Sequence, residues 1–173
     1  IKSGLADYVT LIPNQLIEKL ENNPKVNVSY HHSWTNEFYL LNTKKPPTDN
    51  LWFRRAIASS LDRNTLSTYI YKNTGVGSKG LIPQNIPLFS EPDSLIDFDL
   101  DAARRYLKRS GLEPDSINLD LSYVSTYEAY RLTAFMLLDN LKKIGVRLDL
   151  KPGLWSTNWD KAKSLDTAPN IIS

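Results

Sequence analysis

The two histidines, His31 and His32, are the only imidazole groups in the 173-residue chain, and they are adjacent in sequence. Neighbouring side chains of an extended segment point to opposite faces, so the two rings cannot grip one metal ion together. The chain has no cysteine, which excludes thiolate ligands and disulfides. No HExxH spacing or nucleophile elbow is present. The sequence therefore predicts no metal site, no cofactor and no enzymatic activity.

The segment GVGSKG, residues 75–80, has part of the composition of a phosphate-binding loop. That motif needs four residues between its first glycine and a Gly-Lys-Ser/Thr sequence, in a tight turn from strand to helix. Here Lys79 is followed by Gly80, and Pro83 comes soon after. We expect instead a long Gly/Pro-rich loop over residues 73–96. Loops of this length in compact domains are usually functional or anchored on another surface.

Three alternating acids, Asp97, Asp99 and Asp101, resemble the start of a calcium-binding loop. The glycine that such a loop needs at its sixth position is replaced by Ala102. Acids are also favourable in the first turn of a helix, because the helix dipole places partial positive charge there. Capping of a helix that begins after Asp99 explains the three acids more simply.

Four aromatic residues are the strongest candidates for ligand contact: Trp34, Phe38, Trp155 and Trp159. Each lies on or beside the end of an expected strand. Packing in the core is one interpretation, because aromatic side chains are commonly buried. The other is a cleft that receives the side chains of a ligand, because binding pockets are mostly apolar with a few polar anchors. Residue types alone leave both interpretations open.

A local basic patch comprises Lys44, Lys45, Arg54 and Arg55. Over the whole chain, 21 Lys and Arg residues against 19 Asp and Glu residues leave a net charge of +2. Such a balance does not support binding to nucleic acid, which selects strongly basic surfaces. We expect the two arginines to lie on a solvated helix face and the protein to bind no nucleic acid directly.

Length and composition are those of a globular domain. An apolar fraction of 41% and a charged fraction of 23% suit a chain that is long enough to bury a sizeable core. No apolar run reaches the roughly 20 residues of a membrane helix. The chain begins at Ile1 without an initiator methionine, so we expect it to be a piece of a longer protein.

The first part of the chain predicts short extended segments around one helix. Residues 7–13 are expected to form a short strand that stops at Pro13, and residues 25–30 a strand with alternating apolar side chains. Residues 33–42 are a further extended candidate. Between the first two, apolar residues at helical spacing predict a helix that begins near Asn14.

A double proline then separates the third extended segment from two helices. Pro46 and Pro47 cannot donate hydrogen bonds to a sheet, so the strand must end near Asn42. Asp49 or Asn50 caps the next helix. A further helix, capped by Asp62, is expected from Arg63 to about Tyr71. The prolines thus form a stiff corner between a sheet and a helical layer.

The last third has the clearest pattern. Residues 117–123 and 146–150 alternate apolar and polar side chains, which predicts two strands. Between them, residues 126–145 have the periodicity of an amphipathic helix that ends at Gly145. Strand, helix and strand in this order form a βαβ unit with parallel strands and a right-handed crossover. The predicted fold class is therefore α/β, or α+β, with a mixed sheet and flanking helices.

Five segments, in the same order along the chain, resemble those of a known family. They are SGLADYVTLIP (3–13), with Gly-x-Ala-Asp; YLLNTKKPPTDNLWFRRAIASSLDR (39–63), with an Asn-Thr-x-x-Pro-Pro corner; GSKGLIPQNIP (77–87); FDLDAARRYLKRSGL (98–112); and YRLTAFMLLDNLKKIGVRLDLK (130–151). Together they resemble the extracytoplasmic solute-binding proteins of ABC peptide importers, the oligopeptide- and dipeptide-binding family 5. The resemblance covers nearly the whole chain.

This resemblance implies a two-lobed parent protein that closes around its ligand by a hinge motion. Residues 1–173 would form a single partial lobe, on the C-terminal side, with a periplasmic-binding-protein-like type II fold. The implied function is the binding of oligopeptides, dipeptides or another small solute, without catalysis. The implied partners are the membrane permease subunits of an ABC transporter.

The resemblance also assigns ligand-binding residues. The face of the 33–42 segment that carries Trp34, Phe38 and Leu40 would look into the cleft. Some peptide binders have an acid at the position of Leu40, and an apolar residue there does not hold a charged group of the ligand. Trp155 matches an aromatic residue that follows a strand and lines the pocket of the family.

A second interpretation keeps the fold and changes the class of protein. In it, the lobe senses a metabolite within a cytoplasmic transcription regulator. A solute-binding parent would be periplasmic, or extracellular and membrane-anchored. Sequence before Ile1 separates the two, because a signal or lipoprotein cysteine indicates the transporter and a helix-turn-helix indicates the regulator.

Overall fold

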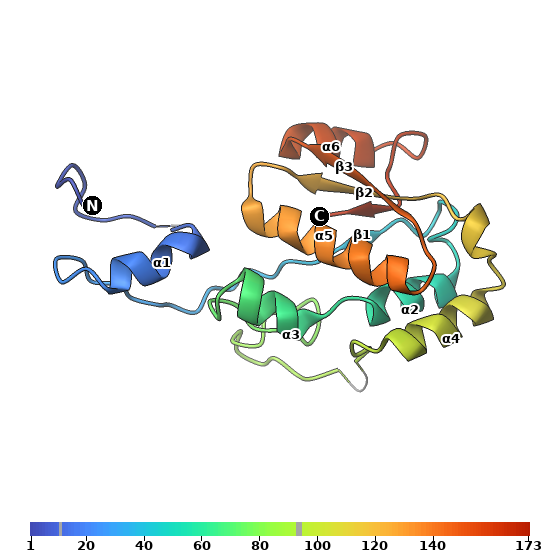
Figure 1. Cartoon of the computed structure of the whole chain (residues 1–173), viewed down its shortest axis with the longest axis horizontal. Helices are drawn as coiled ribbons and strands as arrows, with labels where there is room; N and C mark the ends of the chain where they lie inside the picture. The colour runs from blue at the N-terminus through green and yellow to red at the C-terminus, as the bar shows by residue number, and fades with distance from the viewer. Residues whose placement is uncertain (11, 93–94) are drawn as a thin grey trace.

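The computed structural model describes residues 1–10, 12–92 and 95–173, and its centre is a four-stranded mixed sheet (Figure 1). The strand order is β1-β4-β2-β3. Strand β2 is parallel to both β3 and β4, and β1 is antiparallel to β4. The strands are β1 (Leu40–Leu41), β2 (Leu119–Val124), β3 (Leu148–Gly153) and β4 (Ile171–Ile172). The predicted mixed sheet is confirmed.

The predicted βαβ unit is present as β2, helix α5 (Glu128–Lys143) and β3. The parallel register places Leu119 beside Leu148 and Leu121 beside Leu150. Helix α5 buries Leu137 and other apolar residues of one face completely, as the amphipathic pattern requires. Gly145 then adopts a positive φ of 85°, a conformation that few other residues tolerate, and the chain turns into the next strand.

A pair of packed helices, α2 (Leu51–Ser59) and α4 (Leu100–Ser110), forms a further layer (Figure 1). The side chain of Asn50 caps α2 by accepting hydrogen bonds from the backbone N–H groups of Trp52 at 2.9 Å and Phe53 at 3.3 Å. Asp99 caps α4, and Gly111 ends it in the left-handed conformation. The ends of α4 at Asp99 and Gly111 are as predicted, and the structure decides for Asn50 where the sequence had left Asp49 or Asn50 open as the cap of α2.

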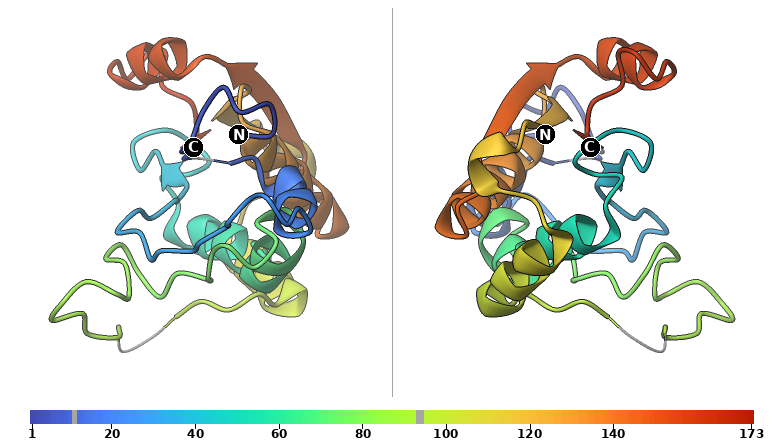
Figure 2. Two further views of the ribbon diagram at one scale, coloured as in Figure 1. Left: turned by 90° about the vertical axis from the view of Figure 1, so that its left-hand side faces the viewer. Right: turned by 90° about the vertical axis from the view of Figure 1, so that its right-hand side faces the viewer.

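The core lies where these layers meet. Fully or almost fully buried side chains come from α2, α4, α5 and the sheet; the largest are Phe53, Leu121, Leu137, Leu141 and Ile171. Helix α6 (Trp155–Ala162) lies on the face of the sheet opposite α5 (Figures 1 and 2). The remaining helical elements are short: α1 (Asn14–Glu21), α3 (Arg63–Thr65), the π-helix η1 (Leu66–Ile70) and the 3₁₀-helix η2 (Pro114–Ser116).

The predicted strands of the first part of the chain are largely wrong. Residues 25–30 form no strand, nor do the described residues of 7–13; Leu11 lies outside the described residues. Of the segment 33–42, only Leu40 and Leu41 pair with another strand. An alternating pattern becomes a strand only when a neighbour supplies hydrogen bonds, and the described residues offer none there.

The long loop after η1 contains no helix or strand over residues 73–92, in agreement with the expected loop. Asp93 and Ser94 lie outside the described residues. Within the described part of the chain, no helix combines the length and the apolar character needed to cross a membrane. The same residues contain no cluster of three His, Asp or Glu side chains placed to hold a metal ion.

The basic patch near the Pro46–Pro47 corner is not simply solvated. Lys45 donates from Nζ to the carbonyl oxygen of Ala168 at 2.9 Å and forms an ion pair with Asp120 at 3.3 Å. Arg54 donates to two backbone carbonyls just before α2. Lys45 thus connects the corner to the sheet, and Arg54 binds the backbone between the corner and α2. The expectation of a solvated arginine face is wrong for Arg54.

Candidate functional site

A cavity of about 460 Å³ lies between β1 and α6, beside β4. Its walls are mainly apolar, with polar side chains from the end of β1 and the end of α6. The lining residues are Leu40, Leu41, Asn42, Thr43, Trp159, Ala162, Lys163, Leu165, Ala168, Pro169 and Ile172. An apolar pocket with a few polar groups is the usual composition of a small-molecule site.

Strand β1 positions one wall of this cavity. Its antiparallel pairing places Leu40 opposite Ile172 and Leu41 opposite Ile171. Because side chains alternate along a strand, the two leucines point to different sides. Leu41 packs against the hydrophobic core, and Leu40 remains partly exposed beside the cavity.

Helix α6 positions the facing wall. Trp155 and Trp159 are four residues apart, so they lie on one face of the helix. Their rings stack with centroids 5.6 Å apart and planes inclined by 9°. Trp159 lines the cavity, and the stack continues the apolar surface to Trp155, which is 59% exposed.

The close approach of α6 to β3 depends on Gly153. A Cβ atom at Gly153 would lie 2.4 Å from Oδ1 of Asn158, which is buried in α6. The side-chain Nδ2 of Asn158 has no hydrogen-bond partner among the described residues. A residue without a side chain is therefore needed at the end of β3 to seat the helix that carries the tryptophans.

The structure brings together two of the four predicted site residues. Leu40 lines the cavity, and Trp155 stacks on a residue that lines it. Phe38 and Trp34 are 49% and 71% exposed, and neither lines this cavity or the second one described below. The sequence singled out Trp159 but did not assign it to the site. Its spacing of four from Trp155 is the signal that could have placed both on a helix.

The other face of the 33–42 segment is anchored to the lobe by tyrosines. The hydroxyl of Tyr71 donates to the carboxylate of Glu37, and Tyr39 packs against the core. Burial raises the pKa of Tyr71, and the hydrogen bond to Glu37 raises it further. Burial also raises the pKa of Tyr39. These phenols remain neutral at ordinary pH, and their arrangement holds β1 in place.

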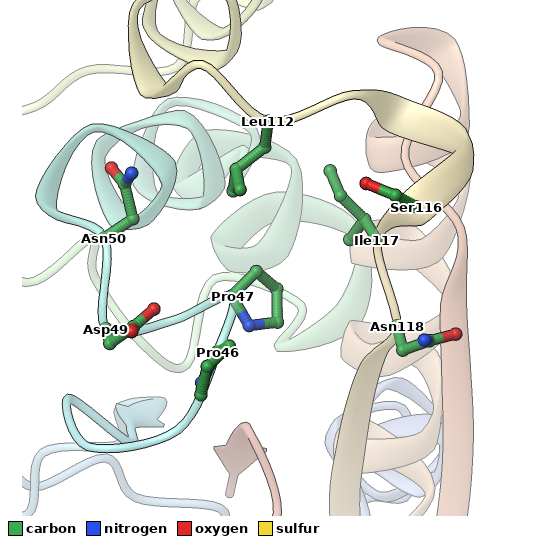
Figure 3. A pocket seen from close by; sticks show the side chains of 8 residues that line it. All are labelled: Pro46, Pro47, Asp49, Asn50, Leu112, Ser116, Ile117 and Asn118. Atoms are coloured by element: carbon green, nitrogen blue, oxygen red, sulfur yellow. The ribbon is translucent and has the colours of Figure 1, made fainter.

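A second cavity, of about 420 Å³, lies at the Pro46–Pro47 corner (Figure 3). It is lined by Pro46, Pro47, Asp49, Asn50, Leu112, Ser116, Ile117 and Asn118. In Figure 3 the side chains of Pro47, Leu112 and Ile117 converge on it. None of the residues predicted to bind ligand lies here, so the cavity between β1 and α6 is the better candidate site.

Residues 1–170 match the model of the family described as bacterial extracellular solute-binding proteins, family 5, middle region. The match covers nearly the whole chain and therefore includes both walls of the cavity. Members of this family bind substrates. These comparisons support the solute-binding interpretation and give no support to a transcription regulator.

Two curated relatives illustrate the similarity. The heme-binding protein A of Haemophilus influenzae is 23% identical over 177 aligned positions, which cover 99% of this chain and 32% of that protein. The oligopeptide-binding protein OppA of Bacillus subtilis is 28% identical over 138 positions, which cover 75% of this chain and 25% of that protein. The chain thus spans about a third or less of these relatives.

Solved structures show the same fold. The oligopeptide-binding protein AppA of Bacillus subtilis, crystallised in complex with a nonapeptide, matches with a TM-score of 0.81. The match has 13% identity and covers 93% of this chain and 34% of that protein. The fold is therefore that of part of a type II periplasmic-binding protein, with a mixed sheet and flanking helices.

Proposed function

We propose a ligand-binding role for this chain, which belongs to the bacterial extracellular solute-binding proteins, family 5. In this proposal, residues 1–173 form one partial lobe of a larger extracytoplasmic protein. The lobe supplies one wall of a cleft that binds a short peptide and closes by a hinge motion. The parent protein delivers its ligand to the permease subunits of an ABC transporter and catalyses no reaction.

The observation that carries this proposal is the apolar cavity between β1 and α6. Leu40 and Trp159 face it from opposite walls, and the stacked Trp155 extends the apolar surface outward. Such a surface suits apolar or aromatic side chains of a peptide. Aromatic residues contribute large contact areas at little entropic cost, which is why they are common among residues that dominate binding energy.

The proposal is strengthened by the peptide-binding relatives. OppA of Bacillus subtilis is named as an oligopeptide-binding protein, and the AppA structure contains a nonapeptide. In this chain, the apolar lining around Leu40 favours apolar side chains of the ligand, and the charged lining residue Lys163 pairs with Asp160 at 2.8 Å. Backbone groups of a peptide can be bound by main-chain hydrogen bonds from both lobes.

The test is native mass spectrometry of the full-length protein as purified, followed by calorimetric titration with any peptide that is released. We expect Trp159→Ala to weaken peptide binding about tenfold, because it removes a ring from the cavity wall. Leu40→Glu should weaken binding of an uncharged peptide by burying a charge. Leu81→Ala, in the exposed loop, is the control and should leave affinity unchanged.

Wild-type affinity in both cavity variants would show that this cavity does not bind the ligand. Recovery of a sugar or another non-peptide solute from the purified protein would contradict a peptide ligand. A tenfold loss in Phe38→Ala or Trp34→Ala would extend the site to the remaining predicted residues, which do not line the cavity in this structure.

A further inference from the structure

Two arginines lie over one tryptophan where α2 and α4 pack together. The guanidinium carbon of Arg109 on α4 is 3.5 Å from the centre of the Trp52 ring, and that of Arg55 on α2 is 4.8 Å from it. The ring of Tyr106 stacks on Trp52 at 6.0 Å. Cations in this position are attracted by the ring and are held in a defined geometry.

The charge of these two arginines is not compensated by acids. Among the described residues, neither Arg55 nor Arg109 has a carboxylate within ion-pair distance. By contrast, Arg104 and Arg105 on the same helix form ion pairs with Asp101 at 2.7 Å and Asp99 at 3.6 Å. Positive charge therefore accumulates toward the end of α4, where Lys108 is also exposed and outside any described ion pair.

A purely structural role explains only part of this arrangement. Arg109 and Lys108 lie in the last turn of α4, where the helix dipole favours cations. Arg55 lies in the middle of α2, where the dipole offers no such stabilisation. Arg55 therefore adds a second positive charge beside Arg109, and no acid balances either charge. The pair suits an external anion.

The helices beneath this surface are rigid, because Phe53, Ala56 and Ala103 are fully buried between them and the core. Binding an anion here therefore requires little ordering of the backbone. The surface is also separate from the candidate cavity, since α6 lies above the sheet and α4 below it in Figures 1 and 2. A partner could be bound there while the cleft holds its ligand.

We propose that Arg55, Lys108 and Arg109, here called the basic seam, dock on the phosphate groups of an anionic phospholipid surface. The planar guanidinium group matches the geometry of phosphate oxygens, and clustered cations strengthen adsorption to anionic bilayers. A protein partner fits less well. Protein interfaces have a core that is poor in charge, whereas the aromatic ring of the basic seam is covered by the cations themselves.

The test is co-sedimentation of the full-length protein with vesicles of phosphatidylcholine, with and without phosphatidylglycerol. We expect binding to the anionic vesicles that weakens as salt is raised. Arg55→Gln combined with Arg109→Gln should weaken this binding on the order of 30-fold, because each cation near an anionic surface contributes to the affinity. Arg55→Lys combined with Arg109→Lys keeps both charges and should retain most of the binding.

The matched control removes two exposed cations elsewhere, with Lys19→Gln and Lys25→Gln in the first part of the chain. It should bind as the wild type does. Equal binding of the wild type to neutral and anionic vesicles would overturn the proposal. It would also be overturned if the control variant lost as much binding as the double glutamine variant of Arg55 and Arg109, or if the double lysine variant did. Binding to soluble polyglutamate but to no vesicle would also overturn it, in favour of an acidic protein partner. Circular dichroism of each variant verifies the fold.

Discussion

Residues 1–39 and residues 100–172 both contain apolar side chains at helix and strand spacing, but the two regions differ in how far these side chains are buried. The second region supplies most of the buried core, with fully buried Leu121, Leu137 and Ile171. In the first region, none of the described residues is fully buried: Tyr39 is partly buried against the core, and Leu5 is 91% exposed. The same kind of pattern thus forms a core in one region and an open surface in the other.

The difference lies in the partners available within the chain. Strand β2 has a neighbour on each side, and α5 covers the apolar face of the unit that it joins. The first region has a helix, α1, that is amphipathic but buries no residue. Apolar side chains stabilise a fold only in proportion to the surface that is removed from water. Local pattern is therefore not sufficient without a second surface of matching shape.

The largest expected effect is the difference in stability between two variants, each of which truncates one leucine, one variant in each region. Leu137→Ala should lower the free energy of unfolding by about 2–5 kcal/mol, because it opens a cavity in a closed core. Leu16→Ala, in α1, should change it by less than about 0.5 kcal/mol, because Leu16 is 48% exposed. Urea unfolding followed by circular dichroism measures both.

The comparison between the regions would fail if the two substitutions cost the same. A large cost for Leu16→Ala in the full-length protein would mean that another part of that protein covers α1. Both Leu→Ala changes introduce a residue of high helix propensity, so their cost reports lost packing. Ala129→Gly in α5, measured in the same way, gives the cost of lowering helix propensity for comparison.

A medium effect on stability is expected where hydrogen bonds of a polar side chain, and not apolar contacts, hold two distant segments together. Asn170 donates from Nδ2 to the carbonyl oxygen of Pro46 at 2.9 Å and to the hydroxyl of Thr48 at 3.2 Å. All three groups lie at the corner that holds β1 against β4. Asn170→Ala removes both hydrogen bonds of a buried side chain and should cost about 2 kcal/mol in the free energy of unfolding.

The matched control for this substitution is Asn118→Ala. Asn118 is exposed next to β2, and its side chain forms no hydrogen bond with the described residues. It should cost less than about 0.5 kcal/mol. If the two alanine variants unfold at the same urea concentration, the hydrogen bonds of Asn170 do not stabilise the corner.

The parts of the fold that could be predicted from sequence are those with a local cause. The caps at Asn50 and Asp99 act on residues two or three positions away. Asp99 was predicted as a cap, and Asn50 was one of two alternatives together with Asp49. The βαβ unit was also predicted. Helix α5 and the strands beside it each bury one face, and this burial gives each element a regular spacing of apolar residues in the sequence.

The parts that were missed depend on distant pairing. Strand β4 has only two residues, too few for a period, and it exists because β2 lies beside it. Leu40 and Trp159 come from elements more than a hundred residues apart, and the pairing of β1 with β4 brings them to one cavity. Helix α6 was not predicted, although Trp155 and Trp159 have helical spacing, because the two tryptophans were placed only on or beside the end of the preceding strand.

The smallest expected effect concerns the acid that begins α4. Oδ1 of Asp99 accepts backbone hydrogen bonds from Asp101 at 2.8 Å and Ala102 at 2.9 Å, and Arg105 lies nearby. The hydrogen bond from Ala102 is the main cause that lowers the pKa of Asp99 below its ordinary value of 3.8. Protonation is therefore harder in the folded state, and the carboxylate stabilises the fold only while it is ionised.

The sign of the pH dependence follows from this lowered pKa. The contribution of Asp99 is complete above the ordinary pKa of 3.8 and is lost as the pH falls through the lower folded value. Asp99→Asn keeps an oxygen that can cap α4 but cannot titrate, so its unfolding midpoint should fall less between pH 5 and pH 3 than that of the wild type. Thermal unfolding at both pH values measures this difference. An equal fall in both proteins would show that other carboxylates, and not the cap of α4, determine stability in acid.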